Sequence, residues 1–398
     1  MNTRKNNYTT IINKMTIRQR PDKRYEGRIT IDGKRKGFYG CTKTEVKNKA
    51  KEYLAELQEN EFIPEKKIKL NEYIPYWLEN YKKNKIQPSS YSRLWTTFYK
   101  QIKPTIGNMY ICDITTKNIQ TLVDEFANPK DQGKALSLSG LKKIVNLLHP
   151  CLDKAVEEKL ILKNPCINIT YPQEDCMQKQ TKVQNTMSDS ELKQFRETAL
   201  SKYKSSGELK SRDWIVLLLM INTGMRVGEM LALEWDDIDM ESNLIYINKT
   251  LQSNIKEYKS ESEVSYYNRI RKSTKTKSGI RCIPLNAQCV EYINVLKQYD
   301  KEHEIISNYV ACSQKGTVTT ARNLQRSLDR LVKCAQIEKH ISLHTLRHTF
   351  GSTLLRRNVD IAVISKLMGH SNITITYNKY IHVIQEEQVK AMNMAKIC

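Results

Sequence analysis

The stretch that decides the fold lies near the end of the chain: His344-Thr-Leu-Arg347-His348, followed by Gly369-His370 and then by Tyr380. Residues three apart are neighbours on a helix surface, so His344 and Arg347 share one face. Ser342 precedes this segment and is a suitable N-cap. A basic helix face, a Gly-His turn and a tyrosine in a polar run are typical of an anion-binding site, not of a hydrophobic core.

A second basic element lies upstream, at the end of the apolar helix predicted from Trp214 to Met220. The sequence Thr223-Gly224-Met225-Arg226-Val-Gly-Glu229 places an arginine directly after a Thr-Gly turn. Such a turn can expose the arginine side chain towards a groove. Arginine suits an anion site because its planar guanidinium stays charged and can hold two oxygens at once.

Composition and charge indicate which class of partner to expect. The chain has 398 residues, of which 39 % are hydrophobic, so we expect two or three packed domains. The net charge of +22 is spread along the chain and favours a polyanion such as DNA. The ten cysteines include no C-x-x-C pair, and there is no Walker loop, so we expect no metal and no cofactor.

Hydropathy favours a protein that remains in the cytoplasm, on DNA. No apolar run approaches the roughly 20 residues that span a bilayer. The polar N-terminus does not have the pattern of a signal peptide. We therefore expect no membrane partner.

The first domain is expected at residues 1–66. Alternating segments at Tyr25–Ile31 and Lys34–Tyr39, joined by Asp32-Gly33, predict a hairpin. Lys14–Arg20 supplies a third strand, and a capping box at Thr42 opens a helix to about Gln58. We expect this basic three-stranded sheet with one helix to bind DNA through Arg28, Lys34, Arg35 and Lys36.

The rest of the chain is predicted to be mainly helical. Apolar residues at helical spacing predict four helices in a second domain, residues 67–172, with Arg93 and Lys100 as DNA contacts. A polar linker follows at 173–185. Residues 186–398 form the last domain, in which helices dominate over one small sheet. The fold class is therefore multidomain and mainly α.

Together, the boxes TGMR-x-x-E and H-x-L-R-H resemble the signature boxes of the tyrosine recombinases, the phage-lambda-type integrases. Met368-Gly369-His370-Ser371 is similar to a Gly-His turn of that family, and Tyr380-Ile-His382 is similar to its Y-x-H ending. The four-helix segment resembles the family's core-binding domain more loosely. With a basic arm-type domain in front, the layout looks most like integrases of phages and conjugative transposons.

The resemblance implies a role for each residue of the site. Tyr380 would be the nucleophile, with Tyr377 as the second candidate, and the product would be a 3′-phosphotyrosyl link. His344 would assist the tyrosine. The residues that would stabilise the charged transition state are Arg226, Arg347 and His370.

The resemblance also implies a lysine on a β-hairpin as the acid that protonates the 5′ oxygen. The matching stretch runs from Ser273 to Pro284. We choose Lys275, because the family's pattern K-T-x-x-S-x-R, whose spacing near the turn varies, precedes an Ile-Pro, and keep Lys277 as the alternative. Lys277 would otherwise contact DNA, as would Arg281.

The implied activity is site-specific recombination without metal or ATP. It proceeds through a Holliday junction on duplex DNA with crossover and arm-type sites. The implied partners are four protomers on the DNA and an accessory directionality or DNA-bending protein. A type IB topoisomerase and a DNA-binding module with decayed boxes remain the alternatives. A metal nuclease using Asp236, Asp237 and Asp239 fits less well, because no distant acidic partner is evident.

Overall fold

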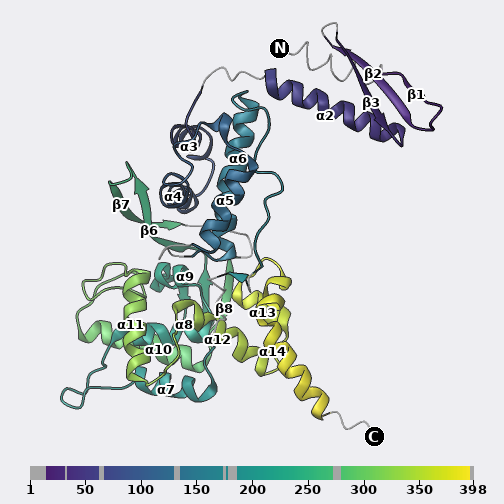
Figure 1. Ribbon diagram of the computed structural model, residues 1–398. Helices are drawn as coiled ribbons and strands as arrows, with labels where there is room; N and C mark the ends of the chain where they lie inside the picture. The colour runs from purple at the N-terminus through teal and green to yellow at the C-terminus, as the bar shows by residue number, and fades with distance from the viewer. Residues whose placement is uncertain are drawn as a thin grey trace. The chain divides into compact units, whose positions relative to one another are not determined.

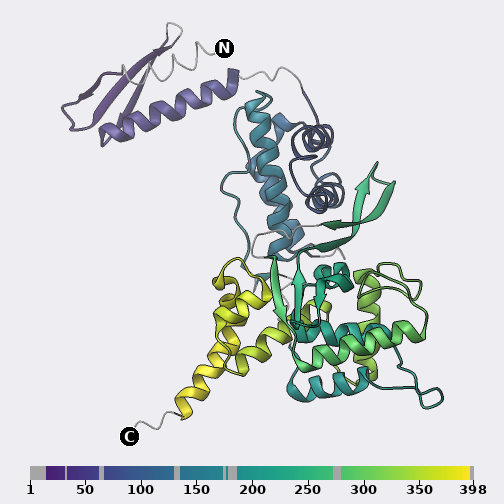
Figure 2. The ribbon, with the colours of Figure 1, turned by 180° about the vertical axis from the view of Figure 1, so that it is seen from behind.

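The structure is a computed structural model that describes residues 15–31, 34–61, 67–129, 135–173, 176–177, 186–271 and 279–394. The chain forms two compact units. One contains residues 1–85 and 94–181, and the other contains residues 86–93 and 182–398. Figures 1 and 2 show the elements of the chain from opposite sides.

An antiparallel sheet with one helix forms the N-terminal part, as the sequence predicts. The sheet has the order β1-β2-β3, with β1 at Ile17–Gln19, β2 at Tyr25–Ile31 and β3 at Lys34–Gly40. Helix α2, Lys43–Glu61, covers one face of the sheet. The core between them contains Met15, Ile29, Phe38, Val46, Ala50 and Leu54. The Asp32-Gly33 turn lies outside the described residues.

Helices α3 to α6 follow, and each begins close to its predicted start. The α-helices are α3 at Leu70–Trp77, α4 at Pro88–Thr97, α5 at Thr116–Ala127 and α6 at Leu138–Glu157. Two of them continue as π-helical turns, Leu78–Lys82 and Phe98–Ile102, and a 3₁₀ turn spans Ile111–Asp113. Thr115 caps α5 through a complete capping box with Asn118. Val123, Ala127, Leu141 and Val145 pack α5 against α6.

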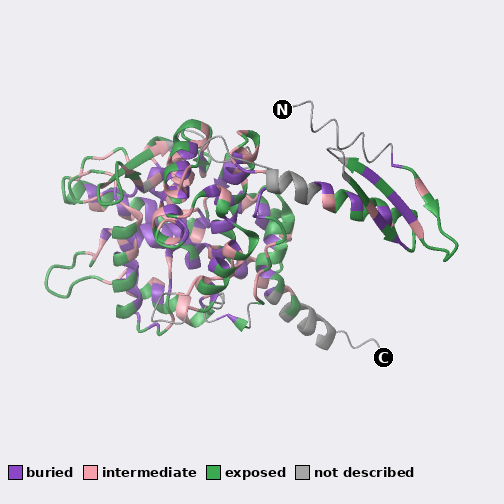
Figure 3. Cartoon of the chain, turned by 45° about the horizontal axis from the view of Figure 1, so that its top comes forward, coloured by how far each residue is buried: buried purple, intermediate pink, exposed green. Residues whose placement is uncertain are grey.

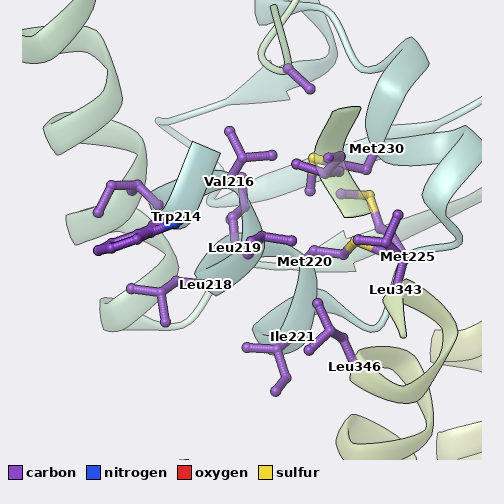
Figure 4. Packing of buried hydrophobic residues seen from close by; sticks show 14 of the residues in the cluster. Trp214, Val216, Leu218, Leu219, Met220, Ile221, Met225, Met230, Leu343 and Leu346 are labelled. Atoms are coloured by element: carbon purple, nitrogen blue, oxygen red, sulfur yellow. The ribbon is translucent and has the colours of Figure 1, made fainter. Parts of the chain in front are cut away.

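The second unit is built around α8, Arg212–Thr223, whose residues from Trp214 to Met220 are all buried. Figure 4 shows side chains of α8 packed with Met225, Met230, Leu343 and Leu346. The other helices are α7 at Asp189–Ala199, α9 at Val227–Ala232, α10 at Ala287–Glu302, α11 at Ala321–Cys334, α12 at Leu343–Arg356, α13 at Ile361–Met368 and α14 at Ile373–Met394.

Two small antiparallel sheets complete this unit. One has the order β4-β5-β8, with strands at Ile238–Asp239, Leu244–Ile247 and Arg281–Pro284. The other is a hairpin of β6, Thr250–Tyr258, and β7, Val264–Arg271, which the sequence analysis missed. The signal was present in Val264-Ser-Tyr-Tyr-Asn-Arg-Ile270, since β-branched and aromatic residues favour strands. Among the described residues, no helix is long and apolar enough to cross a membrane.

Gly224 ends α8 in a conformation that brings two helices close together. Its φ of +62° lies in the left-handed region, which favours glycine. A Cβ atom at this position would lie 2.3 Å from the ring of Phe350 on α12. The turn that the sequence predicted before Arg226 is therefore the place where α8 and α12 approach each other closely.

A buried ion pair holds α10 against the start of α8. Arg212 donates to Asp300 Oδ2 at 2.7 Å and to the Val310 carbonyl oxygen at 2.9 Å. Its side chain is 5 % exposed. Removing one partner of such a pair leaves a buried charge without compensation, which is costly.

We therefore expect Asp300→Ala to destabilise the second unit by about 3–5 kcal/mol. The measurement is calorimetric unfolding of the full chain, in which one transition moves to lower temperature. The neighbouring exposed Lys301→Ala is the control and should leave the transition in place. An unchanged transition in Asp300→Ala would show that the pair contributes little.

Candidate active site

Arg226 lies at the entrance of the candidate site, as the N-cap residue of α9. Its Nη1 donates to Glu229 Oε1 at 2.8 Å, and its Nη2 donates to the Gly369 carbonyl oxygen at 2.8 Å. The side chain remains 42 % exposed. The guanidinium is therefore fixed at one edge and open to solvent elsewhere.

Arg347 lies deeper, on α12, and is 2 % exposed. It donates from Nη1 to the Gly224 carbonyl oxygen at 2.7 Å and from Nη2 to that of Met368 at 2.5 Å. Burial, together with the nearby positive charge of Arg226, lowers the pKa of Arg347 to about 9. The side chain is therefore still a cation at neutral pH, and an anion beside it would gain a strong partner.

Arg281 on β8 completes a set of three arginines. Its Nε donates to the Leu367 carbonyl oxygen at 2.6 Å, and its Nη atoms bind both carboxylate oxygens of Glu229 at 3.1 and 2.9 Å. We expected Arg281 to contact DNA, but it is buried, and its guanidinium is held within the protein. In this structure Arg281 binds Glu229 and the Leu367 carbonyl, and so supports the turn that carries His370.

The three arginines therefore bind three successive carbonyls, those of Leu367, Met368 and Gly369. These carbonyls lie at the C-terminal end of α13, where a helix has no further backbone donors. Positive side chains also complement the negative end of the helix dipole. The turn that carries His370 is thus anchored to α9, β8 and α12 at once.

Glu229 links two of the arginines and is buried. Burial opposes its ionisation, but the hydrogen bonds and charge of Arg281 and the charge of Arg226 outweigh this and lower the pKa of Glu229. Glu229 also accepts a hydrogen bond from the Arg226 backbone N–H at 2.9 Å. The contacts of Glu229 are those of a structural partner of the two arginines.

Two of the histidines approach the arginines from different elements. His344 lies on the first turn of α12, and partial desolvation of its ring, with the charges of Lys379 and Arg347, lowers its pKa. His370 Nδ1 lies 2.8 Å from the Thr376 hydroxyl. Burial and the charges of Arg347 and Arg226 lower the pKa of His370 to about 4, so it is neutral at pH 7. A neutral ring whose Nδ1 accepts from Thr376 would carry its proton on Nε2.

Tyr380 is on α14, but its hydroxyl is turned into an apolar cluster. The side chain is 1 % exposed and packs with Ile364, Met368, Phe350, Leu354, Leu355 and Val359. Among the described residues, its hydroxyl donates to Met368 Sδ alone, at 3.5 Å. Burial raises the pKa of Tyr380 to about 12. Tyr377, by contrast, is 45 % exposed.

Two residues that the sequence analysis did not select shape this cluster. A Cβ atom at Gly351 would lie 2.3 Å from the Tyr380 hydroxyl oxygen, so only glycine leaves room for the phenol. His348 lies between His344 and Tyr380, with ring centroids 4.4 and 6.0 Å away. The sequence offered one signal for Gly351, a glycine inside a predicted helix.

The remaining predicted site residues lie elsewhere or outside the description. Lys275 and Lys277 fall outside the described residues. Arg28, Arg35, Arg93 and Lys100 have exposed side chains. Lys36 is exposed with its ammonium 5.2 Å from the ring centre of Tyr53, and the side chain of Lys34 is not described.

The acidic cluster considered for a metal nuclease is neutralised by a lysine. Lys249 binds Asp237 at 2.9 Å and also binds Glu234. Asp239 instead accepts from the backbone N–H groups of Glu241 and Ser242 in a turn. Within the described part of the chain, no group of three or more His, Cys, Asp and Glu residues could hold a metal ion.

Comparisons with known proteins agree with this geometry. Residues 185–387 match the phage integrase family, and residues 69–127 match the N-terminal SAM-like domain of phage integrases. A XerC-like tyrosine recombinase of Caldanaerobacter subterraneus subsp. tengcongensis is 28 % identical over 372 residues, which cover 90 % of each chain. The transposase from transposon Tn916 of Enterococcus faecalis is 26 % identical over 255 residues, 61 % of this chain and 58 % of that one.

Solved structures share the fold at low identity. The Tn1549 transposon integrase in complex with transposon right end DNA has a TM-score of 0.61 at 20 % identity, covering 81 % of this chain and 99 % of that one. A lambda integrase tetramer bound to a Holliday junction has a TM-score of 0.59 at 16 % identity, covering 91 % and 94 %.

Fold and site together define an enzyme that breaks and rejoins DNA strands, a tyrosine recombinase. The chain belongs to the phage integrase family. Its activity is site-specific DNA recombination, as the two boxes predicted.

The buried histidines make the stability of this unit depend on pH. Burial and the nearby His344 and Lys379 lower the pKa of His348 to about 3, against about 6.5 when unfolded. Between these values the unfolded chain binds more protons, so stability is lost as the pH falls below about 6.5. At pH 5 this amounts to about 2 kcal/mol for one histidine.

We expect the melting temperature of the second unit to fall between pH 7.5 and pH 5, and to fall less in His348→Gln. Scanning calorimetry of the full chain at both pH values measures this. The exposed His303→Gln is the matched control and should keep the wild-type fall. An equal fall in His348→Gln and in the wild type would contradict the assignment to His348.

Proposed function

We propose that this recombinase moves a mobile element, a conjugative transposon or a phage, by attack of Tyr380 on the scissile phosphate. The Tyr380 oxygen bonds to phosphorus, the bond from phosphorus to the 5′ oxygen breaks, and Lys275 supplies the proton to that oxygen. His344 accepts the phenol proton. A 5′ hydroxyl from a partner duplex reverses the step, so the energy of the phosphodiester bond is retained without metal or ATP.

The observation that carries the proposal is the convergence of two arginines and a histidine on one turn. Arg226 and Arg347 both bind carbonyls next to His370, so their guanidinium groups lie beside its ring. A phosphate that replaces the carbonyl contacts would receive charge-assisted hydrogen bonds. Neutral His370 can donate from Nε2 to a non-bridging oxygen, and this stabilises the charge that develops in the transition state.

The position of Tyr380 implies a movement before catalysis. A phenol with a pKa of about 12 in an apolar cluster is a poor nucleophile. Closer to the Arg347 guanidinium and out of the apolar cluster, it would lose its proton more readily. We infer that the Tyr380 side chain moves out of the apolar cluster that contains Met368 when DNA is bound. The movement would use the kink in α14 at Tyr380 itself, where φ is −115° and ψ is 16°.

The assembly that we propose is four protomers on paired duplex sites in the cytoplasm. The tetrameric lambda integrase bound to a Holliday junction, with which this chain shares its fold, supports this arrangement. An accessory protein that bends DNA or sets direction is a further proposed partner. Two-site strand exchange separates this function from a type IB topoisomerase, which relaxes supercoiled DNA without paired sites.

Nucleophile identity is tested with a nicked duplex that carries the crossover site, found from the DNA that flanks the gene. The duplex is incubated with the full chain in EDTA and analysed on a denaturing gel. We expect a covalent protein–DNA adduct with the wild type and with Tyr377→Phe, and none with Tyr380→Phe, because only Tyr380 is proposed to bond to phosphorus.

Each other outcome changes a different part of the proposal. Loss of the adduct in Tyr377→Phe alone would make Tyr377 the nucleophile. An adduct that forms only with added divalent metal would remove the metal-free mechanism. Tight binding of the crossover site without any adduct would favour a DNA-binding module with decayed boxes.

The proposed division of labour assigns residues 1–66 to arm-type sites, 67–172 to core binding and 186–398 to catalysis, with 173–185 as linker. Arg93, Lys100 and Lys277 would contact the core DNA.

Deleting residues 1–66 should weaken binding to distal arm sites by about 10-fold or more, while cleavage at the crossover site persists. Gel shifts on separate arm and crossover duplexes measure both effects. An equal loss on both would contradict a separate arm reader.

A further inference from the structure

The face of the N-terminal sheet opposite α2 has an acidic residue at its centre. Register pairs Arg18 on β1 with Glu26 on β2, and Glu26 with Tyr39 on β3, so the three side chains form one row. Glu26 is 3 % exposed. Figure 3 shows both buried and exposed residues along these strands. A carboxylate is unexpected on a surface proposed to meet DNA, because phosphates repel it.

Arginines on both sides bind this carboxylate, each in a different way. Arg18 binds Oε2 through Nε at 3.3 Å and through Nη2 at 3.1 Å. Arg28 binds Oε1 through Nε alone, at 2.7 Å. Both Nη nitrogens of Arg28 therefore have no acceptor among the described residues. Arg28 is held at the base of its guanidinium and presents its terminal edge, with the side chain 56 % exposed.

The strand next to Arg28 has no side chain at the paired position, and the Tyr39 hydroxyl lies over that position. Arg28 pairs across the sheet with Gly37, which has no side chain. A Cβ atom at Gly37 would lie 3.2 Å from the Tyr39 hydroxyl oxygen, tighter than a usual contact. That hydroxyl donates to Glu26 Oε1 at 3.4 Å, and the guanidinium carbon of Arg20 lies 5.4 Å from the Tyr39 ring centre.

These contacts pre-organise one arginine. A free arginine side chain loses much rotamer freedom when it binds, and a fixed guanidinium loses less. The Glu26 carboxylate stays charged, because its hydrogen bond with Arg28 lowers its pKa against the effect of burial. Two Nη nitrogens side by side match the O6 and N7 acceptors of guanine in the major groove.

We propose that Arg28, held by Glu26, reads a guanine in arm-type DNA sites. Arg28 contacts the base, and Glu26 is a positioning residue that acts through Arg28. This inference rests on the proposed function of residues 1–66 as a DNA-binding domain. It adds the base that is recognised and the residue pair that recognises it.

The experiment uses the full chain and a duplex library with randomised positions, followed by sequencing of the bound fraction. The wild type and the variant lacking residues 1–66 are compared first, and the motif that disappears is the arm motif. If both select the same motif, the proposed function of the domain fails, and with it this inference.

If an arm motif appears, single variants test the pair. We expect Arg28→Ala to reduce the preference for guanine at one position by about 10- to 100-fold. Glu26→Gln should reduce the preference at the same position by a smaller factor. It should also strengthen binding to duplexes that lack this guanine, because a negative charge has been removed.

Stronger binding of Glu26→Gln to duplexes without the guanine distinguishes a positioning residue from a merely structural one. If the ion pair were merely structural, Glu26→Gln would lower binding to all duplexes equally, and this outcome would overturn the proposal. An unchanged guanine preference in Arg28→Ala would also overturn it. The exposed ion pair of Asp22 with Arg24, 3.4 Å apart, provides the matched control. Asp22→Asn should leave the guanine preference unchanged, and circular dichroism verifies that each variant is folded.

Discussion

The catalytic part of this protein depends on the binding of three arginines to one turn of backbone. The carbonyls of residues 367–369 face α9, β8 and α12, and each accepts from the arginine of one of these elements. Three guanidinium groups this close would repel one another. The carbonyl oxygens, the end of the α13 dipole and the Glu229 carboxylate offset that repulsion. The result is a positively charged site whose arginines are fixed by the protein's own backbone.

This arrangement explains why the two boxes of the sequence contain more than catalytic groups. Gly224 supplies a left-handed turn and a carbonyl for Arg347, and Glu229 supplies the counter-charge for Arg226 and Arg281. The role of Gly351 is the absence of a side chain, since any side chain there would collide with the Tyr380 phenol. Each of these residues determines where an arginine or the tyrosine lies.

The sequence predicted elements whose signals are local. The N-cap predicted at Ser342 was found where expected, because a cap involves residues three apart. The burial of Arg281 could not be predicted, because its partners lie 52 and 86 residues away and no periodicity encodes them. The apolar surroundings of Tyr380 were missed for the same reason: α12 and α13 enclose it by tertiary packing. The motifs named two arginines that the fold brings to the turn before His370, but they did not indicate the direction of the Tyr380 side chain.

The hydrogen bond between His370 and Thr376 makes two parts of the site move together. Thr376 and Tyr380 are four residues apart on α14, so they lie about one turn apart on the same side of the helix. A displacement of α14 that carries Tyr380 out of its cluster as a rigid unit also pulls the Thr376 hydroxyl away from the imidazole. Release of the nucleophile is thereby interlocked with rotational freedom of the histidine ring. Only bending at the kink lets the tyrosine swing while the ring stays locked.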